Sequence, residues 1–399
     1  MKYGLFFPLC VSIMLLSIMS ACWSDSSSGS DGLIHVDVTK DYPEKEFLLQ
    51  DLFEVEYVRL ETNDDFLTAG FVLEVSDHYV VLRNTNIFSG DFYLFDRQTG
   101  KGVAHLNRKG QGGEEYTNLL DLLVDEQAGE LYLNSHFNKM IYVYDFEGNF
   151  KRSFKQQGVL FYNRIGLLGD YLIADDDQIQ EIETGPQPLR DHFLVLSKSD
   201  GQVVQAPSIP YERKIPLILY APDGSWECMN LRKMEPCDGD WLLVETSADT
   251  IYRMDASLRL TPYIVRTPSV QEEERLFLFP SLYGGKRYQF MCVVKNEYDF
   301  QQKEGFPRTN LVYDSEEKVL YRSTLYNGDM VDSEPINTSS RSFTYRNMND
   351  RGVAFTQTLF AHELVEAYQE GRLKGHLKDI ATTLGEEDNP VILIAKYKR

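Results

Sequence analysis

The chain has 399 residues, of which 43% are hydrophobic and 25% are charged. This composition is typical of globular proteins and excludes a collagen, a disordered chain or a polytopic membrane protein. The 40 Lys and Arg residues against 61 Asp and Glu residues give a net charge of −21. Such a charge repels phosphate backbones, so we expect no nucleic-acid partner.

The N-terminus predicts export and attachment to a membrane. Residues 4–19 form an apolar run that is short for a membrane span, and Met19-Ser20-Ala21-Cys22 follows directly. This arrangement resembles a bacterial lipoprotein signal, in which residues 1–21 are removed and Cys22 is diacylated. Two acyl chains give a stable anchor. The alternative is a simple secretory signal that is cut after Ala21.

The segment after Cys22 predicts a flexible tether over residues 22–32, because it is rich in Ser and Gly. Trp23 stands where some lipoproteins carry an Asp that keeps them in the inner membrane. We therefore expect an outer-membrane lipoprotein of the bacterial cell envelope, on either face of that membrane.

The remaining cysteines are Cys228, Cys237 and Cys292, which is an odd number for an oxidising compartment. Cys228 and Cys237 are close enough in sequence to close a loop as a disulfide. The alternative is that all three are free thiols.

The middle of the chain repeats one pattern. A strand rich in aromatic and β-branched residues ends in a small polar residue, and a turn follows. The polar residues recur at intervals of 49 to 59 residues, at Asp96, Asp145, Ser197, Asp255 and Asp314. Each of these strands is preceded by another candidate strand, at residues 79–82, 131–133, 171–174, 241–244 and 290–294.

A four-stranded antiparallel unit that repeats at this interval is typical of a β-propeller. Five units are visible, and we expect a sixth to combine residues 55–61 with residues 342–358 and 391–397, which would close the ring. The sequence therefore predicts an all-β, six-bladed propeller of four-stranded antiparallel blades, as a single domain over residues 33–399. Residues 359–384 interrupt it with helical periodicity, which predicts a short helical hairpin as a cap or a lid.

Three stretches resemble a known family. They are residues 51–62, the glycine-rich residues 109–116, and Asp388-Asn389-Pro390-Val391. Together they resemble the six-bladed β-propeller lipoproteins of Bacteroidetes, many of which have no known function. Gly113 and Glu114 stand where that family has Pro-Gly. The resemblance implies fold and location, but little chemistry, because propellers carry many functions.

Residues 108–116 form the most distinctive loop. Its glycines permit close backbone approach, and its polar side chains and tyrosine could bind a sugar or a peptide. The candidate binding residues are Arg108, Lys109, Gln111, Glu114, Glu115 and Tyr116. The alternative is a structural loop between two blades, whose charges are solvated.

Two further positions are candidates for carbohydrate chemistry. Trp226 follows a turn and could stack on a sugar ring, or it could pack within the protein. Thr250 lies in Asp249-Thr250-Ile251, which resembles the O-glycosylation signal of Bacteroidetes periplasmic proteins.

The sequence predicts no metal site and no cofactor. None of the seven histidines forms a close metal-binding pair. Residues 175–177 are three consecutive aspartates, which would diverge on a strand, so we do not expect them to hold Ca²⁺.

Three functions remain open. The first is a binding or scaffold module for a glycan, peptide or protein partner. The second is a glycan hydrolase or lyase with its site at the central channel. The third is a periplasmic sensor or assembly factor whose C-terminal helices, with Phe360 and Leu364, contact the partner. The oligomeric state is left open.

Overall fold

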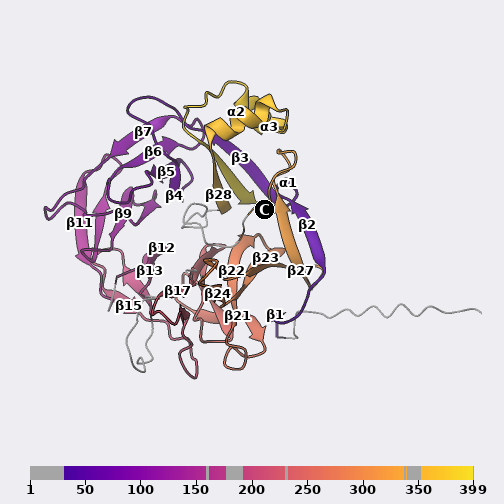
Figure 1. Ribbon diagram of the computed structural model, residues 1–399. Coiled ribbons are helices and arrows are strands. Elements are labelled where there is room, and N and C mark those ends of the chain that lie inside the picture. Colours follow the sequence, from indigo (N-terminus) through magenta and orange to yellow (C-terminus); the bar gives the residue numbers. More distant parts are fainter. Residues whose placement is uncertain are drawn as a thin grey trace, which may run out of the picture.

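The computed structural model describes residues 31–158, 161–176, 192–229, 232–336, 338 and 352–398. The predicted signal peptide, Cys22 and most of the tether lie outside these residues. Six small sheets form a ring, which confirms the predicted all-β propeller (Figure 1). No helix within the described ranges has the length and apolar character needed to cross a membrane.

The first three blades are regular four-stranded meanders. Blade 1 contains β4 (Phe71–Val75), β5 (Tyr79–Arg83), β6 (Phe92–Asp96) and β7 (Gly102–Leu106). Blade 2 contains β8 (Asp121–Asp125), β9 (Glu130–Ser135), β10 (Met140–Tyr144) and β11 (Phe150–Lys155). Blade 3 contains β12 (Arg164–Leu168), β13 (Tyr171–Asp175), β14 (Phe193–Ser197) and β15 (Val203–Gln205).

Blades 4 and 5 each carry one additional strand from the N-terminus. Blade 4 contains β18 (Met234–Cys237), β19 (Asp240–Leu243), β20 (Thr250–Met254) and β21 (Leu260–Thr267), and β1 (Ile34–Asp37) pairs parallel with β21. Blade 5 contains β22 (Leu276–Gly284), β23 (Tyr288–Lys295), β26 (Arg308–Asp314) and β27 (Val319–Tyr326), and β2 (Glu44–Leu48) pairs parallel with β27. The five repeated polar residues of the sequence lie at the end of the third strand in blades 1–5, or directly after it.

Both ends of the chain build blade 6, as predicted. It contains β28 (Val353–Leu359), β29 (Val391–Tyr397) and β3 (Phe53–Arg59), and β29 lies between the other two. This blade has three strands among the described residues, whereas four were predicted. Thr358 near the end of β28 donates a hydrogen bond of 2.6 Å to the carbonyl of Gly70, just before β4 begins. The strand β28 therefore runs opposite to its neighbour β4.

The remaining elements are short. The helix α1 (Leu49–Leu52) connects β2 to β3. The helices α2 (Ala361–Gln369) and α3 (Gly375–Ala381) lie within the predicted helical segment. Two hairpins extend from the ring, one formed by β16 (Ile218–Tyr220) and β17 (Trp226–Cys228), the other by β24 (Tyr298–Asp299) and β25 (Glu304–Gly305).

The hydrophobic core is divided among the blade interfaces. Six clusters of buried side chains each join two neighbouring blades, and the cluster between blades 5 and 6 also holds α2 and α3. Because a blade buries both of its faces, its inner strands are apolar at successive positions rather than at alternate ones. This explains the imperfect period-two pattern of the sequence.

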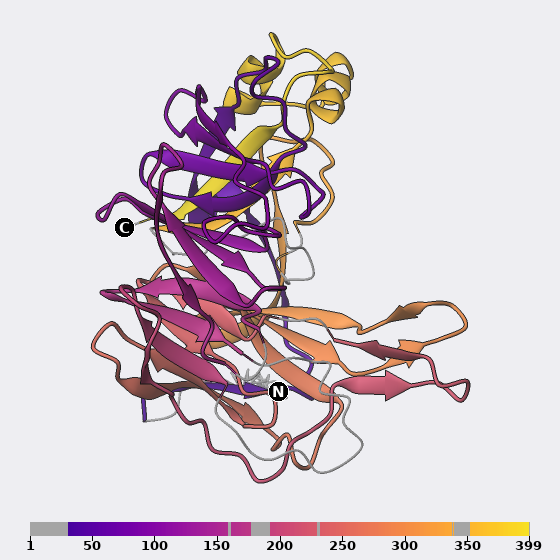
Figure 2. The same ribbon diagram turned by 90° about the vertical axis from the view of Figure 1, so that its left-hand side faces the viewer.

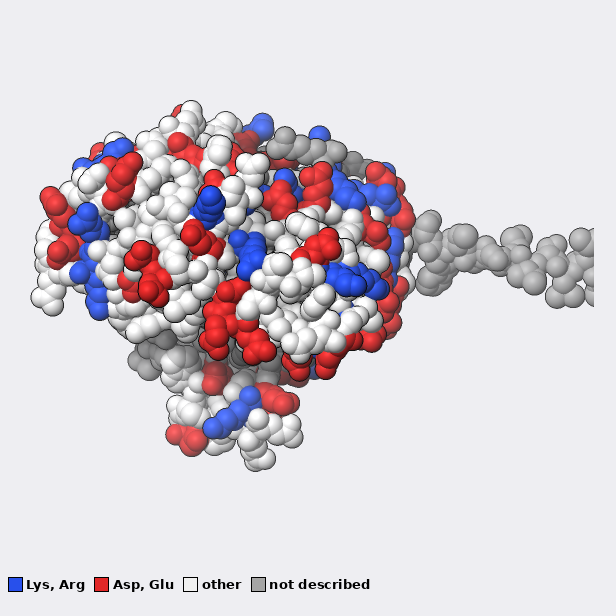
Figure 3. Space-filling view, turned by 90° about the horizontal axis from the view of Figure 1, so that it is seen from above, with Lys and Arg blue, Asp and Glu red and all other residues white. Residues whose placement is uncertain are grey.

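The ring has two different faces. The turn face carries the short connections between the first and second strands of blades 1–5, together with Tyr397 near the C-terminus. The loop face carries the longer connections, both hairpins and the helices α2 and α3. Figure 2 shows the hairpins projecting on the side away from the C-terminus. Figure 3 shows acidic and basic side chains interspersed over the side that faces upward in Figure 1.

Candidate ligand-binding site

A cavity of about 1290 Å³ opens on the turn face. Its walls come from distant parts of the chain: β2 and α1, the turn between β22 and β23, the turn between β26 and β27, and the C-terminal end of β29. Asp77 of blade 1 and Asp238 of blade 4 also line it. The cavity thus spans contributions from four blades, as expected of a binding site built on a ring of repeats.

Aromatic side chains form the rigid part of the wall. The rings of Tyr283 and Tyr397 meet edge to face with centroids 5.2 Å apart, which ties blade 5 to the C-terminal strand. Tyr288 meets Phe47 of β2 in the same way at 5.8 Å. Burial raises the pKa of Tyr288, so this phenol is neutral at physiological pH. Edge-to-face packing of this kind fixes ring orientation.

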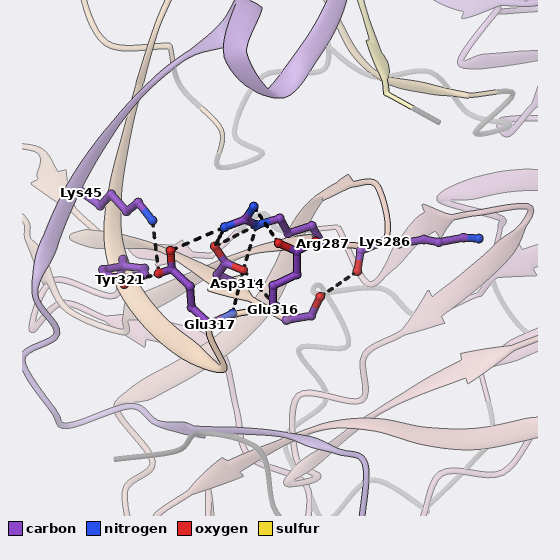
Figure 4. A network of polar contacts seen from close by, with 8 residues as sticks. Lys45, Lys286, Arg287, Asp314, Glu316, Glu317 and Tyr321 are labelled. Atoms are coloured by element: carbon purple, nitrogen blue, oxygen red, sulfur yellow. Dashed lines mark hydrogen bonds and ion pairs between the residues drawn. The ribbon is translucent and has the colours of Figure 1, made fainter. Parts of the chain in front are cut away.

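An ion pair between Arg287 and Asp314 fixes one side of the cavity (Figure 4). The Nε of Arg287 lies 3.0 Å from Oδ1 of Asp314, and its Nη2 lies 2.8 Å from Oδ2. The Asp314 side chain is fully buried, and it also accepts the backbone N–H groups of Glu316 and Glu317. Burial acts to raise the pKa of Asp314, but these hydrogen bonds prevail and hold it below its usual range.

A second contact holds β2 against blade 5. The hydroxyl of Tyr321 donates a hydrogen bond of 2.5 Å to Glu317, and Lys45 lies 3.4 Å from the same carboxylate. The hydrogen bond to Glu317 raises the pKa of Tyr321 to about 12. The ammonium of Lys45 also lies 4.4 Å from the centre of the Tyr321 ring. The wall of the cavity is therefore preorganised by charge as well as by packing.

Charges of both signs line the cavity. Four cations and five carboxylates contribute, namely Lys45, Lys286, Arg287 and Lys398 with Glu46, Asp51, Asp77, Asp238 and Glu316. Lys286 is exposed, and its side chain points away from the network around Arg287 (Figure 4). Within the described ranges, no group of three or more His, Cys, Asp or Glu side chains is arranged to hold a metal ion. The lining suits a polar ligand that carries both charges.

The predicted binding loop is located elsewhere, on the loop face. Tyr116 is fully buried, its hydroxyl donates to the carbonyl of Gly90 at 2.5 Å, and it accepts the N–H of Arg108 at 2.9 Å. Burial raises the pKa of Tyr116. The hydroxyl is bonded to Gly90 and Arg108, and the ring is buried in the hydrophobic cluster between blades 1 and 2. Tyr116 therefore offers no aromatic platform to a ligand. This placement agrees with the alternative of a structural loop.

The charged residues of that loop divide into two groups. Arg108 donates to the carbonyl of Gly148 at 3.0 Å, which joins blades 1 and 2, and Glu115 accepts the N–H of Gly112 at 2.8 Å. Lys109, Gln111 and Glu114 have exposed side chains. Arg108 and Glu115 are exposed as well, but contacts within the protein hold their side chains.

The other predicted positions also lie away from the cavity. Trp226 is 37% exposed on β17, and Thr250 is the half-buried first residue of β20. Cys228 and Cys237 are free cysteines, so the disulfide that their spacing allowed is not formed in this structure. Burial raises the pKa of the Cys228 thiol.

The C-terminal helices offer a smaller surface than the sequence suggested. Phe360 is 42% exposed, whereas Leu364 is 1% exposed and belongs to the cluster between blades 5 and 6. Leu364 therefore stabilises the fold and is not available to a partner. The helical periodicity predicted one shared face for both residues, whereas Phe360 precedes α2 as its N-cap residue and only Leu364 is covered by the propeller.

A buried charge network lies on the loop face between blades 3 and 4. His192 is 5% exposed, and its two ring nitrogens lie 3.1 Å from Asp175 and 3.0 Å from Glu245. Lys214 bonds to the same Glu245 at 2.9 Å. Burial acts to lower the pKa of His192, but the two carboxylates prevail and raise it. Two carboxylates at the two ring nitrogens favour the imidazolium form, and the ring joins the two blades.

Sequence reasoning missed the residues of the cavity. The turn at residues 284–287, Gly-Gly-Lys-Arg, is the one local signal that could have indicated it, because paired glycines before two cations mark an exposed turn. The other lining residues carry no shared pattern.

The ring of six sheets places this protein in the class of six-bladed β-propellers. Its family model, "Domain of unknown function (DUF4934)", matches residues 33–396, and the chain belongs to that family. None of the curated proteins compared with the chain is similar to it.

Two solved structures from Bacteroides match this chain. An exported-protein candidate from Bacteroides fragilis NCTC 9343 has a TM-score of 0.59 at 14% identity, covering 89% of this chain and 99% of its own. A member of the DUF4221 family from Bacteroides vulgatus ATCC 8482 has a TM-score of 0.44 at 8% identity, covering 87% and 99%. At these identities the first likeness supports the propeller fold and nothing more.

Proposed function

We propose that this protein is a lipid-anchored binding module of the bacterial cell envelope, and that it holds a peptide segment of a partner in the turn-face cavity. The cavity is the observation that carries the proposal. Its volume of about 1290 Å³ is more than that of a site for a small metabolite. Its aromatic wall and its charges of both signs complement the side chains of an extended peptide.

The lipid anchor and the location rest on separate support. The segment from Met19 to Cys22 has the pattern of a lipoprotein signal, and a similar propeller from Bacteroides fragilis carries a name that proposes export. Replacing Cys22 by Ser should abolish labelling with a palmitate analogue in cells and release the protein from the membrane fraction. Unchanged labelling would show that Cys22 is not the lipidated residue.

The cavity is tested with an array of short synthetic peptides and the purified full-length protein. Peptides that carry both charges should bind, and calorimetry with the strongest peptide should give an affinity for comparison. Lys286→Glu, which reverses an exposed charge of the lining, should weaken that affinity roughly tenfold, or about 1.4 kcal/mol. Glu316→Lys should also weaken it.

The matched control is Lys109→Glu, which makes the same charge change at an exposed lysine on the opposite face. Its affinity should equal that of the wild type. Equal losses in Lys109→Glu and Lys286→Glu would assign the effect to net charge and would contradict binding in the cavity. Failure of every peptide in the array to bind would contradict the peptide as the ligand class.

A further inference from the structure

The hairpin of β16 and β17 carries two exposed aromatic residues side by side. Tyr220 and Trp226 lie directly opposite each other in the antiparallel pairing, and they are 58% and 37% exposed. Residues that pair in this way project from the same face, with Cβ atoms roughly 5 Å apart. The two rings therefore emerge next to each other from one face of a narrow arm, which Figure 2 shows projecting away from the ring.

The opposite face of the arm is the one that contacts the protein. Leu219, whose side chain alternates with that of Tyr220, packs against the hydrophobic cluster between blades 4 and 5. This contact fixes which way the arm faces. Tyr220 and Trp226 thus point outward because Leu219 is needed inward, and the register of the hairpin keeps them there.

The tip of the arm is held by its own hydrogen bonds. The N–H of Ala221 donates to the carbonyl of Ser225 at 2.8 Å, and the N–H of Gly224 donates to that of Ala221 at 3.0 Å. The carboxylate of Asp223 accepts both the N–H and the hydroxyl of Ser225, at 2.9 and 2.6 Å. A ligand that stacks on the two rings would therefore meet a preorganised surface, with little ordering entropy to lose.

The charge around the rings selects the kind of ligand. Asp223 lies in the tip, and residues 218–228 contain no Lys or Arg. Glu227 pairs with Leu219 and therefore projects from the face opposite to the two rings. The carboxylate of Asp223 and the lack of cations on the arm disfavour phosphate, sulfate and uronate groups. Broad rings that expose flat faces instead suit the C–H faces of sugar rings, with the tyrosine hydroxyl and the indole N–H able to bond to sugar hydroxyls.

We propose that Tyr220 and Trp226 form a binding platform for a neutral oligosaccharide, with one sugar ring on each aromatic ring. The platform is distinct from the turn-face cavity and lies on the opposite side of the propeller. It does not rest on the peptide proposed for that cavity, so either site can fail its test without affecting the other.

The test uses the purified full-length protein and soluble neutral polysaccharides: a β-glucan, a xyloglucan, a mannan and starch. At least one should retard the protein in a native affinity gel, and the matching oligosaccharide should give an affinity by calorimetry. Tyr220→Ala and Trp226→Ala should each weaken that affinity roughly tenfold, and the double variant should show no retardation. Trp226→Phe keeps an aromatic face and should retain most of the affinity.

The matched control is Phe137→Ala, which removes an aromatic ring that is 61% exposed elsewhere on the loop face. It should bind as the wild type does. All variants should keep the wild-type melting temperature, since the rings that they remove are exposed. Absence of retardation by every polysaccharide would overturn the proposal, and so would equal binding by the wild type and the double variant. The proposal would also be overturned if the arm bound a basic peptide and no polysaccharide, and if salt and Asp223→Asn each abolished that binding.

Discussion

Gly166 of β12 lies flat against the indole of Trp241, so that a methyl group on Gly166 would overlap the ring. Trp241 is 1% exposed, and its Nε1 donates to the carbonyl of Leu167 at 2.8 Å. The indole ring thus packs against Gly166, while its N–H is bonded to the backbone of Leu167. This one contact joins the inner strand of blade 3 to the second strand of blade 4.

We expect Gly166→Ala to destabilise the protein by about 1–3 kcal/mol, because the interface has no room for a further methyl group. Chemical denaturation would measure the loss. Trp241→Phe in the same chain should recover part of it, since the smaller ring frees space. The control is Gly113→Ala, where no atom lies within 4 Å of the added methyl group. A loss at Gly113 as large as that at Gly166 would refute the steric explanation.

Substitutions at the two members of the Arg287–Asp314 ion pair should differ in their effect on stability. Arg287→Ala leaves a carboxylate with a fully buried side chain that still accepts backbone N–H groups but has lost its cation. The guanidinium itself is 38% exposed. We therefore expect Arg287→Ala to lose more stability than removal of an exposed pair but less than removal of a fully buried one. Asp314→Asn, which keeps an acceptor for the turn, should cost less.

The same pair predicts sensitivity to acid. The pKa of Asp314 is lowered in the folded protein. The stability that the ionised Asp314 contributes is therefore fully present above the ordinary pKa of 3.8, and it is lost as pH falls through the folded pKa. Denaturation curves in acid should show a wild-type stability that falls more steeply than that of Asp314→Asn. Parallel curves for the two proteins would contradict this assignment.

His192 predicts the opposite dependence on pH. Its pKa is raised above the ordinary value of 6.5, so the folded protein binds more protons than the unfolded chain above that pH. Its contribution is therefore full below about pH 6.5 and declines as pH rises through the folded pKa. His192→Gln should lose about 3–5 kcal/mol at neutral pH, because Asp175 and Glu245 are left buried without the imidazolium.

Denaturation at a series of pH values would measure this difference. The difference in the free energy of unfolding between wild type and His192→Gln should become smaller toward alkaline pH. His78→Gln is the control, since His78 pairs with Glu126 but its side chain is 76% exposed. A gap for His192 that stayed constant with pH would show that the ring is neutral in the folded protein.

Tyr116→Phe tests whether the glycine-rich loop is structural. The change removes the hydroxyl that bonds to Gly90 and Arg108, and it leaves both groups without that partner in a buried site. We expect a loss of about 1–3 kcal/mol in the free energy of unfolding. Gln111→Ala, at an exposed position of the same loop, should have no measurable effect on stability. Unchanged stability in Tyr116→Phe would reopen the loop as a ligand site.

The strands and the ring were predictable from the sequence because their signals are local. Asp96 and Asp314 end the third strand of their blades, and each accepts N–H groups of the turn that follows. That chemistry repeats in every regular blade, so its interval revealed the propeller. The parallel pairing of β1 with β21, and of β2 with β27, carries no turn signal in the sequence. The reversed direction of β28 depends on contacts with a segment almost 290 residues away.

The candidate sites were less predictable because exposure is decided by distant residues. Tyr116 looked available for stacking, but Gly90 binds its hydroxyl and the blade 1–2 cluster covers its ring. The cavity combines Lys45 with Lys398, and no local pattern connects two residues so far apart. Trp226 was identified from its turn, whereas Tyr220 became a partner only through the register of the hairpin.

The order of strands in blade 6 sets the time at which the propeller can be completed. In the pairing of β3 with β29, Phe53 lies opposite Tyr397 and Arg59 lies opposite Val391. The early strand β3 can therefore pair only after almost the last residues of the chain have been made. Until those residues are present, β3 has no neighbour in its own sheet. Pairings over such separations form slowly. A chain with this arrangement can cross a membrane unfolded and complete its ring only after its end has followed, and any truncation before Val391 leaves the ring open.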